Sequence, residues 1–302
     1  MTISRRDTHS AVYQFYQHLI VCAVVLINLL HTHGGIASEP FLCMTYNIRF
    51  ANSKDGKDAW PHRVDTVAAH LRQADILGLQ EVTHGQLLDL EQRLPSFNWY
   101  GLGRDNGKKQ GEYSPVFYRA SLFSHIDEGT FWLSETPEIV GSKGWDAALP
   151  RVCSWVILKI KATGQTIWCA STHFDHRGPV ARNNSGAVIH NKARAFSVKA
   201  SRILMGDFNC LKGSSPYKNI LAPDIAQSIF VDARQRSISQ PVGPNSTFNG
   251  FTVLKPEKII DHIFVSPDVI IHDYWIDNPK TLTGRFASDH LPVVVRVQIP
   301  KK

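Results

Sequence analysis

Short apolar runs recur along the chain and predict the strands of a buried sheet. Each run is four to eight residues long and is bounded by polar or turn-forming residues, which is typical of strands that are covered on both faces. The predicted strands are Phe41–Tyr46, Ile76–Leu79, Pro115–Tyr118, Ser154–Ile160, Thr166–Ser171, Arg202–Met205, Ile259–Val265 and Pro292–Ile299.

Three segments between these runs predict helices. Arg63–Leu71 and Gly85–Leu94 carry apolar residues at a spacing of three and four, so each presents one apolar stripe. Pro179–Lys199 is a third predicted helix, although its periodicity is weaker. We expect Asp127–Pro150, which is rich in Gly, Pro and Trp, to form a long irregular excursion beside a site rather than a pair of strands.

The alternation of strands and helices predicts a layered α/β sandwich. No internal repeat, low-complexity tract or linker interrupts the chain between Glu39 and Lys302, which favours a single domain over residues 39–302. A hydrophobic content of 43% and a charged content of 20% exclude a disordered chain.

The N-terminal 38 residues predict a signal peptide. Arg5 and Arg6 precede the apolar run Leu19–Leu30, and small residues follow between Gly34 and Ser38. Because about 20 apolar residues are needed to cross a bilayer, this 12-residue run favours secretion or a periplasmic location. A retained membrane anchor is the alternative.

The remaining cysteines and the net charge give little information about the chemistry of the protein. Beyond residue 38 the chain has four cysteines, Cys43, Cys153, Cys169 and Cys210, and no C-x-x-C pair that would suggest zinc or redox chemistry. Cys43, Cys153 and Cys169 lie in strand-like runs, so we expect buried thiols. The net charge of +7 suits an anionic substrate, but the Lys and Arg residues are scattered.

Polar side chains stand at the ends of the predicted strands. Gly206-Asp207-Phe208-Asn209 follows one apolar run, and Ser288-Asp289-His290-Leu291-Pro292 precedes another. Either segment alone would read as a turn or a cap. Because ligands of α/β sheets bind in the crevice at strand ends, the two together indicate a shared site, and carboxylates with histidine suit a divalent metal and phosphate chemistry. The other such residues are Asn47, Glu81, Glu112, His173, Asp261 and His262.

These segments resemble the endonuclease/exonuclease/phosphatase superfamily, whose core motifs occur here in the family's order from about Phe41 to Ile299. The motifs are Met44–Arg49, Leu79–Val82, Thr172-His173, Gly206–Asn209, Ile260–Val265 and Ser288–Val293. The resemblance implies an α/β fold, a four-layer α/β/β/α sandwich with two central mixed sheets. It also implies metal-dependent hydrolysis of a phosphoester by in-line attack of water, with Mg²⁺ or Mn²⁺ as the cofactor.

The resemblance assigns a metal site and a reaction centre. Glu81 is expected to bind the metal, with Asn47 as a second ligand or phosphate contact, and Asp289 to complete the site or to orient His290. Asp207 would orient or deprotonate the attacking water and Asn209 would bind a phosphate oxygen. His290 would stabilise the phosphoryl charge, its tautomer fixed by Asp289 or Asp261.

A second imidazole and four further side chains complete the expected site. His173 would stand opposite His290, and Glu112 would be its partner, as in the deoxyribonuclease branch. Arg49 and Asn249 are candidate phosphate contacts, and Asp175 and His176 are candidate extra substrate-binding residues. For Asn249, Asp175 and His176, a plain turn role is an equal alternative.

The expected substrate is a phosphoester, and the family resemblance leaves its class open. A phosphodiesterase or nuclease is the leading interpretation, which the basic charge favours modestly. A phosphatase acting on a small polyol or inositol phosphate is second, and a sphingomyelinase-like enzyme acting on a lipid headgroup is third. A non-catalytic binding domain on the same fold is the rival from a different class. Nothing implies a protein partner, and we expect a monomer.

Overall fold

Two six-stranded mixed β-sheets form the centre of the protein. The structure, a computed structural model, describes residues 37–196, 200–221 and 228–301. The first sheet has the strand order β11-β12-β1-β2-β4-β3 and the second has the order β5-β6-β7-β8-β10-β9. In each sheet one parallel pair, β1 with β2 and β7 with β8, stands among antiparallel pairs.

All eight predicted strands are present, most of them with ends that shift by one or two residues. The first sheet contains β1 (Phe41–Asn47), β2 (Ile76–Gln80), β3 (Phe97–Tyr100), β4 (Val116–Arg119), β11 (Ile270–Ile276) and β12 (Val293–Gln298). The second contains β5 (Phe123–Trp132), β6 (Val152–Ile160), β7 (Thr166–His173), β8 (Ser201–Asp207), β9 (Val231–Asp232) and β10 (Asp261–Val265).

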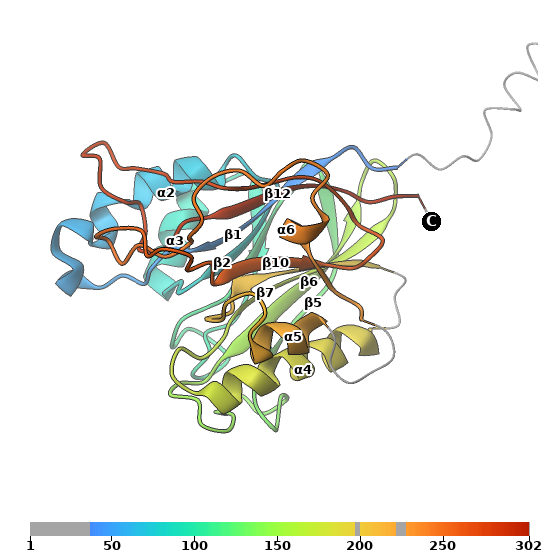
Figure 1. Ribbon diagram of the computed structural model, residues 1–302, viewed down its shortest axis with the longest axis horizontal. Coiled ribbons are helices and arrows are strands. Elements are labelled where there is room, and N and C mark those ends of the chain that lie inside the picture. Colours follow the sequence, from blue (N-terminus) through green and yellow to red (C-terminus); the bar gives the residue numbers. More distant parts are fainter. Residues whose placement is uncertain (1–36, 197–199, 222–227, 302) are drawn as a thin grey trace, which may run out of the picture. The chain divides into compact units, whose positions relative to one another are not determined.

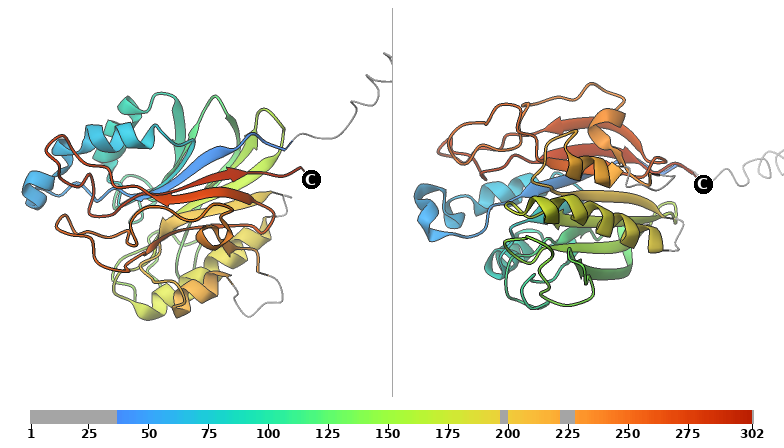
Figure 2. Two further views of the ribbon diagram at one scale, coloured as in Figure 1. Left: turned by 45° about the horizontal axis from the view of Figure 1, so that its top comes forward. Right: turned by 60° about the horizontal axis from the view of Figure 1, so that its bottom comes forward.

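The sheets pack face to face with helices on their outer sides (Figure 1). Helices α2 (Val64–Leu71) and α3 (His84–Arg93) cover the first sheet, and α4 (Pro179–Ala195) and α5 (Ser215–Leu221) cover the second. The two further views in Figure 2 show the same layers. The expected four-layer α/β/β/α sandwich is therefore confirmed.

Strand alternation explains why both faces of each sheet are apolar. In β1, Cys43 points into the core between the two sheets, whereas its neighbour Met44 packs on the side of α2 and α3. Both side chains are buried, so the strand reads as a continuous apolar run rather than an alternating one. Burial of this kind on the central strands fixes the register that brings their polar ends together.

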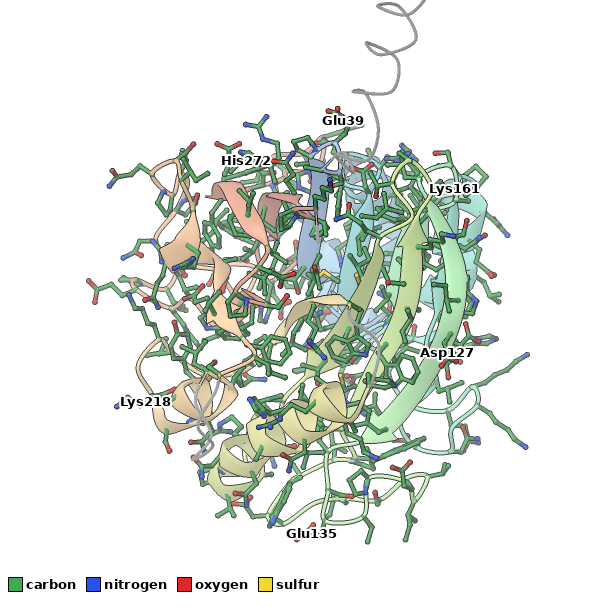
Figure 3. All side chains as sticks on the ribbon, turned by 90° about the vertical axis from the view of Figure 1, so that its right-hand side faces the viewer. Glu39, Asp127, Glu135, Lys161, Lys218 and His272 are labelled. Atoms are coloured by element: carbon green, nitrogen blue, oxygen red, sulfur yellow. The ribbon has the colours of Figure 1, made fainter. Side chains whose placement is uncertain are left out.

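Edge strands are the elements that the apolar pattern missed. The segment Asp127–Pro150 was expected to be irregular throughout, but Asp127–Trp132 belongs to strand β5, which pairs along its whole length with β6. Strand β5 is an edge strand with a mostly exposed, polar centre, and Figure 3 shows Asp127 at the surface of this strand. An edge strand needs few apolar residues, so the run that marks a central strand is absent. Strands β3, β9 and β11, helix α5 and the short helix α6 (Ala233–Arg236) were also not predicted.

Local capping explains the helix starts. Helix α3 begins at a capping box in which the Thr83 side chain accepts from the Gln86 backbone N–H and Gln86 reaches back to Thr83. Helix α4 begins at Gly178 and has Pro179 in its first turn, where proline costs no hydrogen bond. Two short 3₁₀ helices, η1 (Ser53–Asp58) and η2 (Trp60–His62), connect β1 to α2.

The predicted signal peptide or anchor, residues 1–38, lies almost wholly outside the described residues and stays a prediction. Within the part of the chain that the structure describes, no helix has the length and apolar character needed to cross a bilayer. The four described cysteines, Cys43, Cys153, Cys169 and Cys210, are free and buried, as expected, and burial raises the pKa of each thiol.

Candidate active site

Strand register brings the predicted polar residues of both sheets to one place. Parallel pairing sets Asn47 opposite Gln80, next to Glu81, and sets His173 opposite Asp207. Antiparallel pairing of β10 with β8 sets Asp261 opposite Asp207. The two sheets meet where Asn47 Nδ2 donates to Asp207 Oδ2 at 3.1 Å and to Glu81 Oε1 at 2.9 Å.

A cavity of about 580 Å³ opens over these strand ends. Nine of the predicted site residues line it: Arg49, Glu81, Glu112, His173, His176, Asp207, Asn209, Asp289 and His290. The remaining lining residues, which sequence reasoning did not single out, are Phe50, Arg104, Leu149, Arg151, Phe248, Lys258 and Ile260. Four predicted residues lie behind its walls: Asn47, Asp175, Asn249 and Asp261.

Three lining residues hold a left-handed backbone conformation that is unusual outside glycine. The φ angles are 57° at Arg49, 59° at Glu81 and 47° at Asn209. Such conformations cost about 1–3 kcal/mol each and persist where the surrounding structure imposes them. Each residue follows a strand end, so the sharp turn directs its side chain into the cavity instead of along the strand.

Asp207 lies at the centre of the reaction site. Its Oδ1 accepts the backbone N–H of Asn209, and its Oδ2 lies 3.4 Å from His173 Nε2 and 3.7 Å from His290 Nε2. Burial, followed by the charge of Asp261, raises the pKa of Asp207 to about 7. A carboxylate with such a pKa can accept a proton from water near neutral pH.

His290 is held as a cation by two carboxylates. Its Nδ1 lies 2.8 Å from Asp261 Oδ2, and Asp261 is fully buried. Burial alone would lower the pKa of His290, but the charges of Asp261 and Asp207 outweigh it and raise the pKa to about 10. The imidazolium faces the cavity through Nε2, where it can stabilise negative charge on a phosphoryl group.

His173 has the opposite electrostatic character. Its burial, together with the positive charges of Arg151, Arg104 and His290, lowers its pKa well below the usual value, so the ring is neutral. Asn209 Nδ2 approaches its Nε2 at 3.1 Å and also donates to the Phe174 carbonyl. The two histidines therefore differ in charge at neutral pH although both face Asp207.

Glu112 lies beside His173 but is bound chiefly to an arginine. The carboxylate accepts two hydrogen bonds from Arg104, at 2.8 and 3.0 Å, whereas His173 Nδ1 is 4.0 Å away. Glu112, the expected partner of His173, therefore lies next to that ring and is held in place by Arg104. Burial raises the pKa of Glu112, and the Arg104 charge opposes that change.

Glu81 and Asp289 are candidate ligands for a cation. Arg49 Nη1 lies 3.9 Å from Glu81 Oε2 and 3.9 Å from Asp289 Oδ2, so the two carboxylates face one position. Burial raises the pKa of Asp289, and the Glu81 charge adds to that effect, which a bound cation would relieve. One or two carboxylates suffice for Mg²⁺ because it keeps several waters. The Asn47 amide nitrogen, not its oxygen, faces the carboxylates, so Asn47 joins Glu81 to Asp207 in this structure.

A second group of potential ligands lies deeper. Asp207, Asp261 and His290 offer ligand atoms within 4.8 Å of one another, so this buried cluster is also able to bind a metal. In this cluster His290 Nδ1 already contacts Asp261 Oδ2 at 2.8 Å. The Glu81–Asp289 pair, which lines the cavity, and this deeper cluster are thus two candidate cation sites.

Two of the predicted substrate contacts have structural roles instead. Asn249 is fully buried and donates to the Ser288 carbonyl, and its backbone N–H donates to the Asp289 carbonyl, so it shapes the segment that carries Asp289 and His290. Asp175 is buried and accepts from the backbone of Gly178 and from Arg151. These contacts correspond to the turn role that was the alternative for both residues.

The other two predicted contacts face the cavity. Arg49 is half-buried, and its guanidinium is held by two hydrogen bonds to Asp55. His176 is exposed, and its Nδ1 lies 2.8 Å from Arg151 Nη2. Both are placed where a substrate anion can reach them.

The lining residues missed from the sequence come from loops. Phe248 packs edge-on against His290, with ring centroids 5.1 Å apart, and Lys258 Nζ lies 4.0 Å from the Phe248 ring centroid. Arg104 and Arg151 are buried cations on the His173 side of the cavity. The one sequence signal for them was an arginine immediately before a strand-like run at Arg151.

The chain is similar to known proteins over most of its length. The model of the Endonuclease/Exonuclease/phosphatase family matches residues 44–290. A solved endonuclease/exonuclease/phosphatase from Bacteroides vulgatus is 34% identical, with a TM-score of 0.81, over 87% of this chain and 100% of that one. A mannosyl-6-phosphatase from Bacteroides thetaiotaomicron VPI-5482 is 36% identical, with a TM-score of 0.79, over 85% of this chain and 99% of that one.

A curated relative matches over a shorter stretch. The probable CCR4-Not complex 3'-5'-exoribonuclease subunit Ccr4 of Encephalitozoon cuniculi (strain GB-M1) is 31% identical over 121 residues. The match spans 34% of this chain and 24% of that relative, so the chain covers about a quarter of its length.

Proposed function

The chain belongs to the endonuclease/exonuclease/phosphatase family of phosphoester hydrolases, and on that premise we propose that it is a metal-dependent phosphatase that hydrolyses the phosphomonoester of a phosphorylated sugar. The observation that carries the proposal is Asp207, a carboxylate with a pKa near 7 between a neutral and a charged imidazole, beside a pair of carboxylates suited to a cation.

Each site residue has a separate role in the proposed hydrolysis. Water attacks phosphorus in line while Asp207 takes its proton, and the ester oxygen leaves and is protonated from solvent. The His290 imidazolium binds the phosphoryl oxygens as negative charge develops on them, and the Asn209 amide, which contacts His173 and the Phe174 carbonyl, positions His173. Glu81 and Asp289 would hold the metal, which when bound polarises a phosphoryl oxygen as a Lewis acid.

The substrate class rests on the size of the cavity and on one relative. A cavity of about 580 Å³ is in the range of small-molecule sites and has room for a single phosphorylated sugar. The relative named as a mannosyl-6-phosphatase aligns over nearly its whole length. These observations favour the phosphatase, the second of the alternatives that the sequence offered, over the leading nuclease interpretation.

A nuclease is the second candidate. It is supported by the net charge of +7 and by the partial match to a probable exoribonuclease. A nuclease would show an affinity that falls steeply with salt, because binding to a polyanion releases counterions.

A substrate panel separates the two candidates. Phosphate release from mannose 6-phosphate, glucose 6-phosphate and inositol phosphates would be compared with cleavage of single- and double-stranded DNA, RNA and sphingomyelin, with Mg²⁺, Mn²⁺ or chelator. The proposal expects metal-dependent turnover of sugar phosphates with kcat/KM at least about 10²-fold above any nucleic acid, which is a difference of about 2.7 kcal/mol. Cleavage of nucleic acid alone would overturn it in favour of the nuclease.

A further inference from the structure

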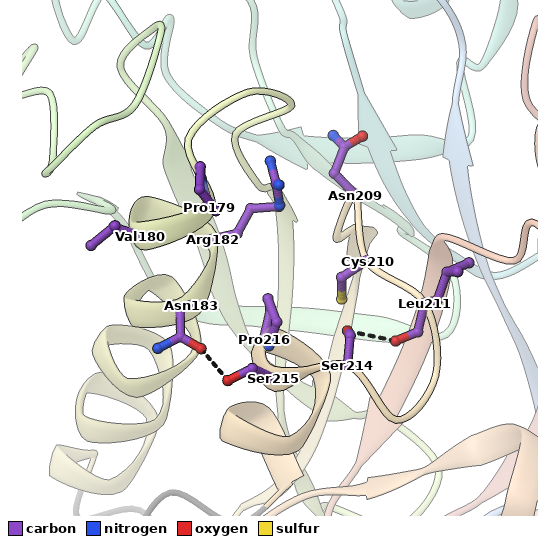
Figure 4. A pocket seen from close by; sticks show the side chains of 10 residues that line it. All are labelled: Pro179, Val180, Arg182, Asn183, Asn209, Cys210, Leu211, Ser214, Ser215 and Pro216. Atoms are coloured by element: carbon purple, nitrogen blue, oxygen red, sulfur yellow. Dashed lines mark hydrogen bonds between the residues drawn. The ribbon is translucent and has the colours of Figure 1, made fainter.

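A second cavity adjoins the catalytic one. It has a volume of about 530 Å³ and lies between the first turns of α4 and the segment from Asn209 to Pro216 (Figure 4). Asn209 lines both cavities, so the second space lies directly beside the catalytic centre. Its walls combine apolar groups, including Val180, Leu211 and Pro216, with the polar side chains of Arg182, Asn183 and Ser214.

Arg182 is anchored to the backbone segment that also binds Asn209. Arg182 Nη1 donates to the Asp175 carbonyl at 2.8 Å, and Asn209 Nδ2 donates to the carbonyl of the preceding residue, Phe174, at 3.1 Å. Both side chains are therefore tied to the same short backbone segment, and both line the second cavity. Figure 4 shows the two side chains extending in the same direction from α4 and from the segment after β8.

The charge of Arg182 is not compensated within the described part of the chain. No carboxylate among residues 37–196, 200–221 and 228–301 forms an ion pair with it, whereas Arg49, Arg104 and Arg151 in the catalytic cavity each have one. A cation in the first turn of a helix is also opposed by the helix dipole. Asp146 accepts from the backbone N–H groups of Val180 and Ala181 but leaves the Arg182 guanidinium facing the cavity.

We propose that the second cavity is an anion subsite in which Arg182 binds a phosphate or carboxylate group of the substrate other than the phosphate being hydrolysed. The carbon skeleton between the two anionic groups would pass Asn209 and pack against Leu211 and Pro216. The inference rests on the proposed function and narrows it: the preferred substrate is a phosphorylated sugar with a second negative group.

Kinetics with two matched substrates test the subsite. In the wild type, we expect a lower KM for glucose 1,6-bisphosphate than for glucose 6-phosphate. Arg182→Ala should raise the KM for the bisphosphate about 10-fold relative to its KM for the monophosphate, as expected for the loss of one charge-assisted hydrogen bond. Arg182→Lys should restore part of the preference. Arg177→Ala, which removes the same charge from an exposed neighbour outside both cavities, is the control.

Binding measurements test the subsite even if the protein does not hydrolyse these sugar phosphates. The Kd of the bisphosphate and of the monophosphate would be measured by calorimetry with Asp207→Asn and with Asp207→Asn/Arg182→Ala, after thermal melting shows that both fold. A preference for the bisphosphate that disappears with Arg182 supports the subsite even if no sugar phosphate is hydrolysed, in which case the proposed function alone fails. Equal effects of Arg182→Ala on both ligands, or no effect on either, would overturn the subsite.

Discussion

The Nδ1 atom of His290 lies 2.8 Å from Oδ2 of Asp261, a carboxylate that is fully buried and whose Oδ1 has no hydrogen-bond partner among the described residues. Among the described residues, His290 is therefore the only side-chain partner of the Asp261 carboxylate. It explains why a buried imidazole is charged at neutral pH, and it leaves the Nε2–H of the ring free to face the cavity. The two residues are 29 positions apart in sequence, Asp261 at the start of β10 in the second sheet and His290 shortly before β12 in the first, and they meet at one reaction centre.

Removing the Asp261 charge should remove the His290 charge. We expect Asp261→Asn to lower kcat about 10²–10⁴-fold with a smaller change in KM, because the imidazolium stabilises charge that develops during the reaction. The measurement is steady-state phosphate release at pH 7. Asp127→Asn, an exposed residue of β5, is the control and should leave kcat within twofold. A loss of less than tenfold in Asp261→Asn would contradict the assigned role.

The two active-site histidines should titrate in different ranges in the metal-free protein. The pKa of His290 is raised to about 10 and that of His173 is lowered well below its usual value, so between pH 6.5 and 8 neither ring changes charge. NMR of the imidazole Cε1–H signals, assigned with His290→Gln and His173→Gln, measures both. If His290 titrates near 6.5, the account of its charge is wrong.

Asp175 should stabilise the fold in a pH-dependent way. Burial raises its pKa, but hydrogen bonds from Gly178, Arg177 and Ala148 and the Arg151 charge outweigh that effect, so the pKa lies well below the ordinary value. A group with a lowered folded-state pKa contributes stability above its unfolded pKa of about 3.9 and loses that contribution as the pH falls below it.

Replacement of Asp175 tests the direction of this pH dependence of stability. At pH 7, Asp175→Asn should reduce the free energy of unfolding by about 3 kcal/mol, because it leaves the buried Arg151 without its ion pair. Urea unfolding from pH 7 to pH 3 should show the difference between wild type and variant shrinking below pH 4. A difference that is constant over this range would show that the lowered pKa contributes nothing to stability.

The cation site should depend on both carboxylates. Glu81→Gln and Asp289→Asn each remove one charge from the pair that faces Arg49 Nη1, so we expect Mg²⁺ or Mn²⁺ affinity to fall at least tenfold in each variant. Calorimetric titration of the purified protein with Mn²⁺ measures this without any substrate. Asp55→Asn is the control variant, because Asp55 contacts Arg49 and is not one of the two candidate ligands Glu81 and Asp289. Unchanged Mn²⁺ binding in both carboxylate variants would move the site to the Asp207–Asp261–His290 cluster.

The sequence predicted the site residues that lie at the ends of strongly apolar strands. His173 and Asp207 are the last residues of their strands and Asp261 is the first residue of β10, and register places these strand ends together, so their proximity could be predicted. It did not find Arg104, Phe248 or Lys258, because these come from loops whose path depends on tertiary packing. Strand β5 was missed because its exposed centre lacks the apolar residues that mark a buried strand. Arg182 lay in a helix of weak periodicity, and only the neighbouring cavity gives it a candidate role.

The most direct test of the central claim is phosphate release by the wild type and by Asp207→Asn, each with Mg²⁺ and with chelator, on mannose 6-phosphate. The account predicts metal-dependent turnover in the wild type, loss of at least about 10³-fold in kcat for Asp207→Asn, and a thermal melting temperature within a few degrees of the wild type. Full activity of Asp207→Asn, or wild-type turnover that chelator leaves unchanged, would contradict it.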